Sequence, residues 1–390
     1  MAKRALIFSL AYYPHLVGGA EVAVKEITDR ISPNEIEFDM VTLYAGSSRY
    51  ERIGNVNIYR VGPHIRVHGT TMPHISYLIK FRYVASAFFK SIFLHHKYHY
   101  DFIWSVMASF NGFSALFFKL IHRKVPFLLT LQEGDTPEHI KKATGIMYPL
   151  YKKIFTNANH IQSISKFLNK YGRSMGATCP STVVPNGVDV ELFSHTYTSS
   201  QMKALEHELG LDPFDSVLIT TSRLVAKNGI ADIIDALAYL PTYTKLLILG
   251  TGPLDKFLRD KTILLKLEKR VTFVGFVPNR ELPLYMRVSD IFIRPSLSEG
   301  MGISFIEAMA SGLPVIATEV GGIPDFLTDG VTGLFCEVNN PRSIAEKVEL
   351  LIGDETLRNT IVKNAREMVR TKYDWKFIVG DMKKVFNLLD

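Results

Sequence analysis

Residues 291–317 read IFIRPSLSEGMGISFIEAMASGLPVIA. Two short apolar runs, Ile291–Ile293 and Pro314–Ala317, stand near the ends of this stretch, and a glycine-rich loop and a helix-like segment connect them. Short apolar runs predict buried strands, and strands that alternate with helical patterns predict a parallel sheet covered by helices. The stretch therefore predicts a strand, a loop, a helix and a second strand of an α/β fold.

The same alternation extends over almost the whole chain. Helical patterns such as Glu21–Ile31, Phe113–His122, Ile230–Leu240 and Leu282–Val288 lie between short apolar runs. The other expected strands are Ala5–Ser9, Phe38–Leu43, Val56–Arg60, Phe102–Val106, Phe127–Leu131, His160–Ser163, Thr182–Val184, Ser216–Ser222, Lys245–Leu249 and Val271–Phe273. This order predicts parallel sheets on both sides of the middle of the chain.

The length of 390 residues suggests two or three domains. Turn signals in Pro185–Gly187 interrupt the alternation before it restarts. We therefore expect two Rossmann-like parallel-sheet domains, at residues 1–188 and 189–374. A last helix, in residues 375–390, packs on the second domain or crosses back to the first. Two such sheets facing each other would form a central cleft, where ligands of open α/β sheets bind.

The composition is that of a globular protein. Hydrophobic residues make up 47% of the chain and charged residues 21%, which excludes a disordered or collagen-like chain. The two cysteines, Cys179 and Cys336, form no C-x-x-C pair, so a disulfide framework and a zinc finger are excluded. A reducing cytoplasm fits this cysteine usage. Residues 3–10 imitate a short signal peptide, but a first strand followed by a glycine turn explains them better.

Basic residues are concentrated in the first half of the chain. Residues 1–190 hold 22 Lys and Arg against 12 Asp and Glu, whereas residues 191–390 hold 23 against 26. The excess predicts either a solvated basic face or an anionic partner, such as a membrane surface, nucleic acid or a phosphorylated substrate. Residues 73–100 interleave Phe and Tyr with Lys and Arg. They predict an amphipathic helix that lies in a membrane interface or packs its aromatic rings on the core.

Charged residues and glycines follow two of the expected strands of the second half. Arg223 and Lys227 come after Ser216–Ser222, and an Arg and a Lys four residues apart can converge on one anion such as a diphosphate. Glu299 and Glu307 come after Ile291–Ile293. Carboxylates pair with sugar or ribose hydroxyls, and the glycines between them expose amide donors at the start of a helix. Each pattern alone is also compatible with exposed charges.

Other chemistries lack their motifs. The chain has no G-x-x-x-x-G-K-[ST], no H-E-x-x-H and no G-x-S-x-G, and Gly250-Thr251-Gly252 lacks the third glycine of a dinucleotide fingerprint. In the first half, Gly18-Gly19-Ala20-Glu21 follows the first strand and opens a helix, which would let an anion approach the backbone.

The ordered set of these motifs resembles the retaining glycosyltransferases of family 4, which have the GT-B fold. The matching segments are Ser222-Arg223-Leu224 to Lys227-x-Gly229, Gly250-x-Gly252-Pro253, Val271-x-Phe273-x-Gly275-x-Val277, Glu281-Leu282-Pro283, Arg294-Pro295-Ser296, Glu299 through Ala310, and Gly321-Gly322. In the first half the likeness rests on Gly18-Gly19-x-Glu21, Thr130 and Pro185 to Asp189.

The resemblance implies an activity and a set of donor-binding residues. It implies transfer of a sugar, with retention, from a nucleoside-diphosphate sugar to an acceptor hydroxyl, without a metal ion or other bound cofactor. Arg223, Lys227 and Glu299 would form the catalytic set, in which the two cations hold the diphosphate. The remaining donor contacts would come from Gly19, Val277, Gly300, Met301, Gly302, Ile303, Ser304 and Glu307, of which Glu307 would bind the ribose.

Two residues depart from the family pattern. Gln132 stands where members often have a His, two residues after Thr130. Gln can hydrogen-bond a sugar hydroxyl but cannot take a proton near pH 7, so that role is changed or absent, and Gln132 is the acceptor-side candidate. Met301 stands where an aromatic residue is common.

Three functions remain open at this point. A cytoplasmic glycosyltransferase would act on a glycan or lipid-linked acceptor in glycolipid or cell-surface polysaccharide synthesis, with its basic half at the inner face of the membrane and no nucleic-acid partner. A sugar-nucleotide epimerase of similar fold is a second candidate. A non-catalytic sugar-nucleotide binding protein is the third.

Overall fold

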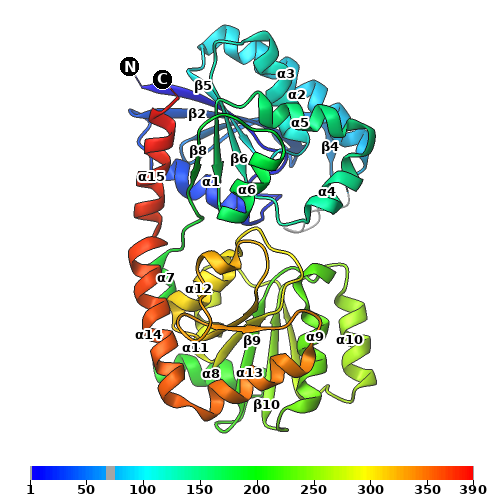
Figure 1. The fold of residues 1–390 in the computed structure, drawn as a ribbon, viewed down its shortest axis with the longest axis vertical. Helices are drawn as coiled ribbons and strands as arrows, with labels where there is room; N and C mark the ends of the chain where they lie inside the picture. Colours follow the sequence, from blue (N-terminus) through cyan, green and yellow to red (C-terminus); the bar gives the residue numbers. More distant parts are fainter. Residues whose placement is uncertain (1, 67–74, 390) are drawn as a thin grey trace. The chain divides into compact units, whose positions relative to one another are not determined.

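A computed structural model describes residues 2–66 and 75–389, which divide into two compact units (Figure 1). The first unit consists of Met1–Asn186 and Trp375–Asp390, and the second of Gly187–Asp374. The chain therefore changes unit slightly earlier than the expected boundary after residue 188. Val188 explains the difference, because its amide donates to the Tyr373 carbonyl at 2.7 Å, within the second unit.

The sheet of the first unit runs in the order β3-β4-β2-β1-β5-β6-β7-β8. Neighbouring strands pair in parallel, and β3 pairs antiparallel with β4. The central strands are apolar on both faces because helices cover both sides. The strands are β1 (Lys3–Phe8), β2 (Ile36–Ala45), β3 (Tyr50–Ile53), β4 (Val56–Ile65), β5 (Phe102–Val106), β6 (Phe127–Leu131), β7 (His160–Ser163) and β8 (Ser181–Val183).

The helices of the first unit follow these strands. They are α1 (Gly19–Asp29), α2 (Tyr77–Tyr98), α3 (Phe110–Ile121), α4 (Pro137–Thr144), α5 (Tyr148–Thr156) and α6 (Lys166–Ser174). Helix α2 begins after Ser76, whose side chain accepts from the Ile79 amide, and ends at His99 in a left-handed conformation. Residues 73 and 74 of the predicted basic helix lie outside the described residues.

The last helix, α15 (Trp375–Asn387), belongs to the first unit. The ring of Phe386 packs on Phe38, Phe102 and Trp104, with centroids 5.2–6.1 Å apart. Lys383 pairs with Glu35 at 2.7 Å. Burial of aromatic surface against three rings stabilises this position of the helix far more than the exposed ion pair does.

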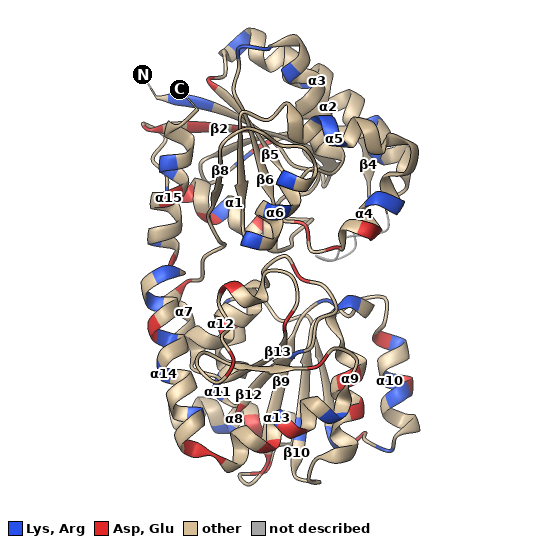
Figure 2. Ribbon diagram, in the orientation of Figure 1, with Lys and Arg blue, Asp and Glu red and all other residues tan. Residues whose placement is uncertain are grey.

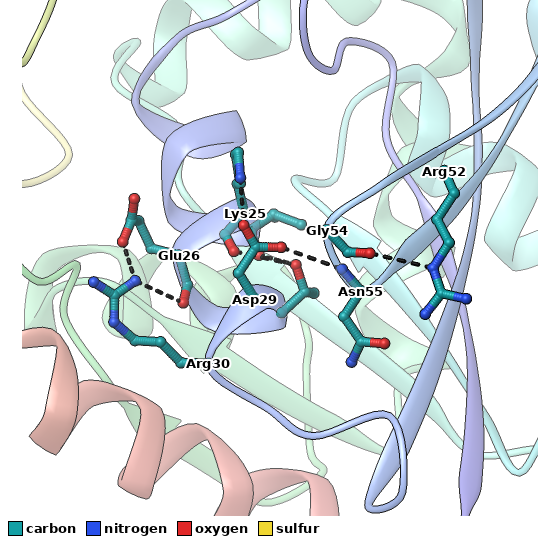
Figure 3. A network of polar contacts seen from close by, with 9 residues as sticks. Lys25, Glu26, Asp29, Arg30, Arg52, Gly54 and Asn55 are labelled. Atoms are coloured by element: carbon teal, nitrogen blue, oxygen red, sulfur yellow. Dashed lines mark hydrogen bonds and ion pairs between the residues drawn. The ribbon is translucent and has the colours of Figure 1, made fainter.

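A polar network ties the β3–β4 turn to the end of α1 (Figure 3). Asp29 pairs with Lys25 one helical turn earlier and accepts from the Asn55 amide at 3.3 Å. The Asn55 side chain is buried and donates to the Ile31 and Ile36 carbonyls at 2.8 and 3.0 Å. Gly54 has φ +56, and a Cβ there would lie 1.8 Å from the Asp29 carboxylate. The turn therefore requires glycine, and the network is structural.

The sheet of the second unit runs in the order β11-β10-β9-β12-β13-β14, with every neighbouring pair parallel. Its strands are β9 (Ser216–Thr221), β10 (Thr244–Leu249), β11 (Val271–Gly275), β12 (Ile291–Arg294), β13 (Val315–Thr318) and β14 (Leu334–Cys336). The helices around it are α7 (Val190–Phe193), α8 (Ser199–Leu209), α9 (Ile230–Ala236), α10 (Asp255–Leu264), α11 (Leu282–Arg287), α12 (Ile303–Ser311), α13 (Pro341–Gly353) and α14 (Glu355–Lys372).

The prediction of an α/β fold built on two parallel-dominated sheets is confirmed, with small differences in the elements. The apolar runs did not reveal β3 and β14. The expected helix Ile230–Leu240 ends at Ala236 and continues as the 3₁₀ turn Leu237–Tyr239.

Candidate functional site

The second unit has a topological switch point between β9 and β12. These strands are neighbours, but the chain continues from β9 to β10 on one side and from β12 to β13 on the other. In open α/β sheets the loops diverge at such a point, and ligands bind there outside the carboxyl ends of the strands. The loops after β9 and β12 carry the Arg223–Lys227 and Glu299–Ser304 motifs.

The two loops touch through their backbones. The Leu297 amide donates to the Lys227 carbonyl at 2.7 Å. Gly229 has φ +67, and a Cβ there would lie 2.1 Å from the Pro295 carbonyl oxygen. Only glycine permits this approach. The structure therefore brings the two predicted motifs together at the carboxyl ends of the strands of one sheet.

The β9 loop presents its two cations differently. Arg223 is exposed, and Lys227 is half-buried. The Asn228 side chain is buried and donates to the Arg223 carbonyl at 2.7 Å, which fixes the turn between the two cations. Gly250 packs on the same loop, because a Cβ there would lie 1.9 Å from the Ser222 carbonyl oxygen. The backbone is thus fixed while the Arg223 guanidinium stays open to solvent.

The β12 loop is organised by Arg294, the last residue of the strand. Its guanidinium pairs with the Glu299 carboxylate and donates to Ser304 Oγ at 2.7 Å. The Gly300 amide donates to the other Glu299 oxygen at 3.1 Å. Glu299 is therefore held on both of its oxygens. The partnership with Arg294 was not predicted from the sequence, although a charged residue at the end of the apolar run IFI required a buried partner.

Helix α12 starts directly after this loop. Gly300, Met301 and Ser304 are buried, and Gly302 precedes the helix with φ +86. The first amides of a helix have no carbonyl partner within the helix, so the amides of Ile303 and Ser304 are available to an anion. The structure places the predicted glycine-rich turn at the start of this helix, and its binding of an anion stays a prediction.

Glu307 lies in the second turn of α12 and is buried. Its Oε1 accepts from the Asn279 side chain at 2.9 Å. Burial raises the pKa of Glu307 to about 7, against the smaller lowering effects of Asn279 and Arg294. Val277 is half-buried in the same segment as Asn279, between β11 and α11. Asn279 was not predicted, and only its position two residues after Val277 could have indicated it.

The remaining predicted residues belong to the first unit. Gly19 opens α1 and is exposed, and a Cβ added there would meet nothing within 4 Å. Gln132 follows β6, is 9% exposed and accepts at Oε1 from the Asn186 side chain at 3.3 Å. Neither residue belongs to the unit that holds Arg223 and Glu299.

The residue after Gln132 is a buried carboxyl group, and it was not predicted from the sequence. Glu133 is 9% exposed, and its Oε1 accepts from the Ala108 amide at 2.7 Å. Its Oε2 is buried without a hydrogen bond to any described residue. Burial raises the pKa of Glu133 above the ordinary value for Glu. Within residues 2–66 and 75–389, no cluster of three or more His, Cys, Asp or Glu side chains is arranged to hold a metal ion.

The two parallel-sheet units have the architecture of the GT-B fold. The chain of Anabaena HepE, solved in complex with UDP and glucose, superimposes with a TM-score of 0.80 at 21% identity, over 99% of both chains. That likeness concerns the fold.

Two family models match consecutive parts of the chain. Glycosyltransferase Family 4 matches residues 17–192, and Glycosyl transferases group 1 matches residues 202–368. An uncharacterised glycosyltransferase of Methanocaldococcus jannaschii is 26% identical over 97% of this chain and 96% of its own. The alpha-monoglucosyldiacylglycerol synthase of Acholeplasma laidlawii is 26% identical over 67% of this chain and 63% of its own. Both models describe glycosyltransferases, and the chain is therefore a glycosyltransferase.

Proposed function

We propose that the protein transfers a sugar, with retention of the anomeric configuration and without a metal ion, from a nucleoside-diphosphate sugar to the hydroxyl of a glycan or lipid-linked acceptor. The observation that carries this proposal is the contact between the Arg223–Lys227 loop and the Glu299–Ser304 loop at the switch point of the second unit. One loop supplies cations, and the other supplies a carboxylate and helix-start amides.

The donor would be held by groups of matching chemistry. Arg223 and Lys227 bind the diphosphate, Arg223 as a fork of donors and Lys227 as a point charge. The amides of Ile303 and Ser304 at the start of α12 bind phosphate and sugar oxygens. Glu299 accepts from sugar hydroxyls, Glu307 from ribose hydroxyls, and the backbone at Val277 meets the base.

The cations also account for catalysis without a metal. The bond between the anomeric carbon and the phosphate oxygen breaks as negative charge grows on the leaving diphosphate, in an oxocarbenium-like transition state. Fixed cations stabilise that charge at the moment it develops. The acceptor oxygen bonds to the anomeric carbon on the face that the diphosphate leaves, and its proton passes to the departing phosphate oxygen. The step balances without a protein nucleophile.

The acceptor is proposed to be a glycolipid or another cell-surface glycan precursor. The relative from Acholeplasma laidlawii is a synthase of a glucosyldiacylglycerol, which supports a lipid-linked acceptor. Because HepE was solved with UDP and glucose, UDP-glucose is the first donor to test. GDP-mannose is the second, because a similar Mycobacterium tuberculosis protein is a GDP-mannose-dependent mannosyltransferase.

Donor turnover tests this function directly. The protein is incubated with UDP-glucose or GDP-mannose, with and without EDTA, and the released nucleotide and the anomeric configuration of the product are followed by NMR. We expect slow donor hydrolysis without an acceptor, unaffected by EDTA, and an axial product from an axial donor. An equatorial product would contradict retention, and loss of turnover with EDTA would contradict metal independence.

We also propose that the first unit faces an anionic membrane surface in the cytoplasm. No helix in the described ranges is long and apolar enough to cross a bilayer. Helix α2 exposes Phe89 and Phe93, at 70% and 61%, beside a hollow of about 690 Å³. Arg49, Arg82 and Lys90 line this hollow, and its described lining contains no acidic residue. Aromatic rings beside cations favour the interface of an anionic bilayer.

The charge distribution supports this orientation. Helices α2, α3, α5 and α6 of the first unit carry Lys and Arg but no Asp or Glu, whereas α1 and α4, like α10 and α13 of the second unit, mix blue and red in Figure 2. Flotation with anionic and neutral vesicles tests the proposal. The native protein should float with anionic vesicles at low salt, and Phe89→Ser should weaken this. The matched control Phe257→Ser, at a 53% exposed site in α10, should float like the native protein. Equal recovery with both kinds of vesicle would contradict the proposal.

A further inference from the structure

We propose that Arg294 is the positioning residue of the donor-sugar loop: it fixes the orientation of the Glu299 carboxylate and joins it to the start of α12. The inference rests on the proposed function, because it concerns how Glu299 and Glu307 meet the donor. Arg294 does not itself touch the bound sugar in this account. It acts through Glu299 and Ser304.

All three nitrogens of the guanidinium are engaged. Nε donates to Ser296 Oγ at 3.2 Å, Nη1 donates to Ser304 Oγ at 2.7 Å, and Nη2 pairs with Glu299 Oε2. Residues 296 and 299 lie in the loop, and residue 304 lies in the first turn of α12. One side chain at the end of β12 therefore links the strand, the loop and the helix.

The surroundings of Arg294 fit a planar guanidinium. The guanidinium carbon, Cζ, lies 4.3 Å from the centroid of the Phe305 ring, and the Arg294 side chain is 7% exposed. Gly302 packs against the Arg294 guanidinium and the Phe305 ring, because a Cβ there would lie 2.6 Å from both Nη2 and the ring. A Lys ammonium could neutralise Glu299, but it could not donate in three directions in one plane. The site is therefore built for Arg and not only for positive charge.

The network leaves Glu299 oriented but still able to bind. Oε2 accepts from Arg294, and Oε1 accepts from the Gly300 amide. A carboxylate has about four acceptor positions, so two remain for the hydroxyls of a donor sugar. Because misplacement by 1 Å can cost about 10²-fold in rate, fixing this carboxylate affects turnover more than nucleotide affinity.

Arg294 also acts on Glu307. Its positive charge opposes the effect of burial on the Glu307 pKa. The Asn279 side chain, which donates to Glu307 Oε1, is neutral. Charged residues on neighbouring elements bond elsewhere: Arg366 of α14 donates to the Ser311 carbonyl, and Arg287 of α11 donates to the His195 carbonyl. Loss of the charge at Arg294 should therefore shift ionisation of Glu307 to higher pH.

The test separates binding of the nucleotide from turnover of the donor. Affinity for UDP and kcat for UDP-glucose hydrolysis are measured between pH 6 and 9, or for GDP and GDP-mannose if the native protein binds those. Arg294→Met should lower kcat about 10²-fold. It should also shift the pH dependence of UDP affinity upward, because Glu307 then ionises at higher pH. Arg294→Lys should keep the native pH dependence while still losing turnover, because it keeps the charge and loses the fork.

A matched control separates positioning from folding. Arg270 is a half-buried arginine of the second unit, and it donates to four carbonyls at the opposite end of the sheet, including those of Thr244 and Leu237. Arg270→Met should lower the melting temperature. It should leave the pH dependence of UDP affinity and that of kcat as in the native protein. A double variant, Arg294→Met with Glu299→Gln, should lose no more turnover than Arg294→Met alone.

The outcomes distinguish this inference from the function on which it rests. If the native protein binds neither UDP nor GDP, the proposed function fails and the role of Arg294 fails with it. If the native protein binds and hydrolyses the donor but Arg294→Met or Arg294→Lys retains native kcat, the function stands and the positioning role is wrong. Additive losses in the double variant would also contradict it.

Discussion

The carboxyl-end loops of the two sheets hold their carboxylates in different ways. In the second unit, Glu299 has Arg294 and the Gly300 amide, and Glu307 has Asn279. In the first unit, Glu133 Oε1 accepts from the Ala108 amide, and Oε2 is buried without a hydrogen bond to a described residue. Both carboxylates of the second unit thus have hydrogen-bonding partners, whereas Glu133 keeps a buried oxygen without one among the described residues.

The two regions differ in how far they are organised before a ligand binds. A donor site with fixed, satisfied charges needs little reorganisation when the sugar nucleotide arrives. A buried carboxylate oxygen without a partner costs free energy until a proton, a water molecule or another group satisfies it. We therefore expect changes on the donor side to affect chemistry, and changes on the acceptor side to affect stability and transfer.

The largest effect is expected at the exposed cation Arg223. Arg223→Ala should lower donor turnover about 10²–10³-fold, because a preorganised charge no longer meets the leaving diphosphate. The melting temperature should stay native, since Arg223 is exposed. Steady-state kinetics and thermal denaturation check both parts. Lys256→Ala, at an 88% exposed site in α10, is the control and should change neither. Native turnover in Arg223→Ala would contradict the assignment of Arg223 to the donor diphosphate.

The second effect concerns Glu307. Its pKa is about 7 in the folded protein against 4.5 for an ordinary Glu, so the folded state holds this proton more tightly than the unfolded state does. Stability should therefore fall as pH rises from about 4.5 to about 7, by about 3 kcal/mol in total, and then level off. Glu307→Gln should remove this component. Urea denaturation at pH 5 and pH 8 measures it. An identical pH dependence in the native protein and the variant would contradict the buried, carboxylate-specific effect.

Glu133 should behave similarly for stability but not for donor chemistry. Its raised pKa means that stability falls as pH rises through the ordinary and then the folded value. At pH 8, Glu133→Gln should stabilise the first unit by about 1–3 kcal/mol, because it removes a buried charge with an unsatisfied oxygen and keeps an acceptor for Ala108. Denaturation of the full chain, followed with donor hydrolysis as a second readout, checks this. Lower stability of the variant at pH 8 would show that a charged Glu133 is satisfied.

The smallest effect is expected at Gln132. Gln132→Ala should reduce transfer to an acceptor about tenfold, equivalent to one hydrogen bond of about 1.4 kcal/mol. Donor hydrolysis without an acceptor should stay native. The ratio of transfer to hydrolysis, measured on one preparation, sharpens the comparison between the two sides. An equal fall in both rates would move Gln132 to the donor side.

Most of the fold could be predicted because its central strands are buried on both faces. Phe102–Val106, Phe127–Leu131 and His160–Ser163 were predicted with the bounds that the structure shows. The edge strand β3 reads YERI and lies partly exposed, so no apolar run marks it. Strand β14 has only three residues. Periodicity fails where a strand is short or is not buried.

The donor-side motifs were easier to predict than their connections. Glu299 and Glu307 lie within one continuous segment, which is one of the segments on which the resemblance rests. The link from Arg294 to Ser304 depends on how the loop folds back, and that from Asn279 to Glu307 depends on strand order. In the first unit, Ala108 and Glu133 come from loops after different strands. Local patterns do not reveal such pairs, because they form only once the sheet has assembled.

Nucleotide binding tests the central claim most directly. A thermal-shift panel with UDP, GDP, ADP and NAD is run on the native protein and on Arg223→Ala. A ligand at 100 times its dissociation constant adds about 2.7 kcal/mol of stability, which such a panel detects. We expect one nucleoside diphosphate to stabilise the native protein and not the variant. Absence of any shift, or an equal shift in both proteins, would contradict a donor site built on the loops after β9 and β12.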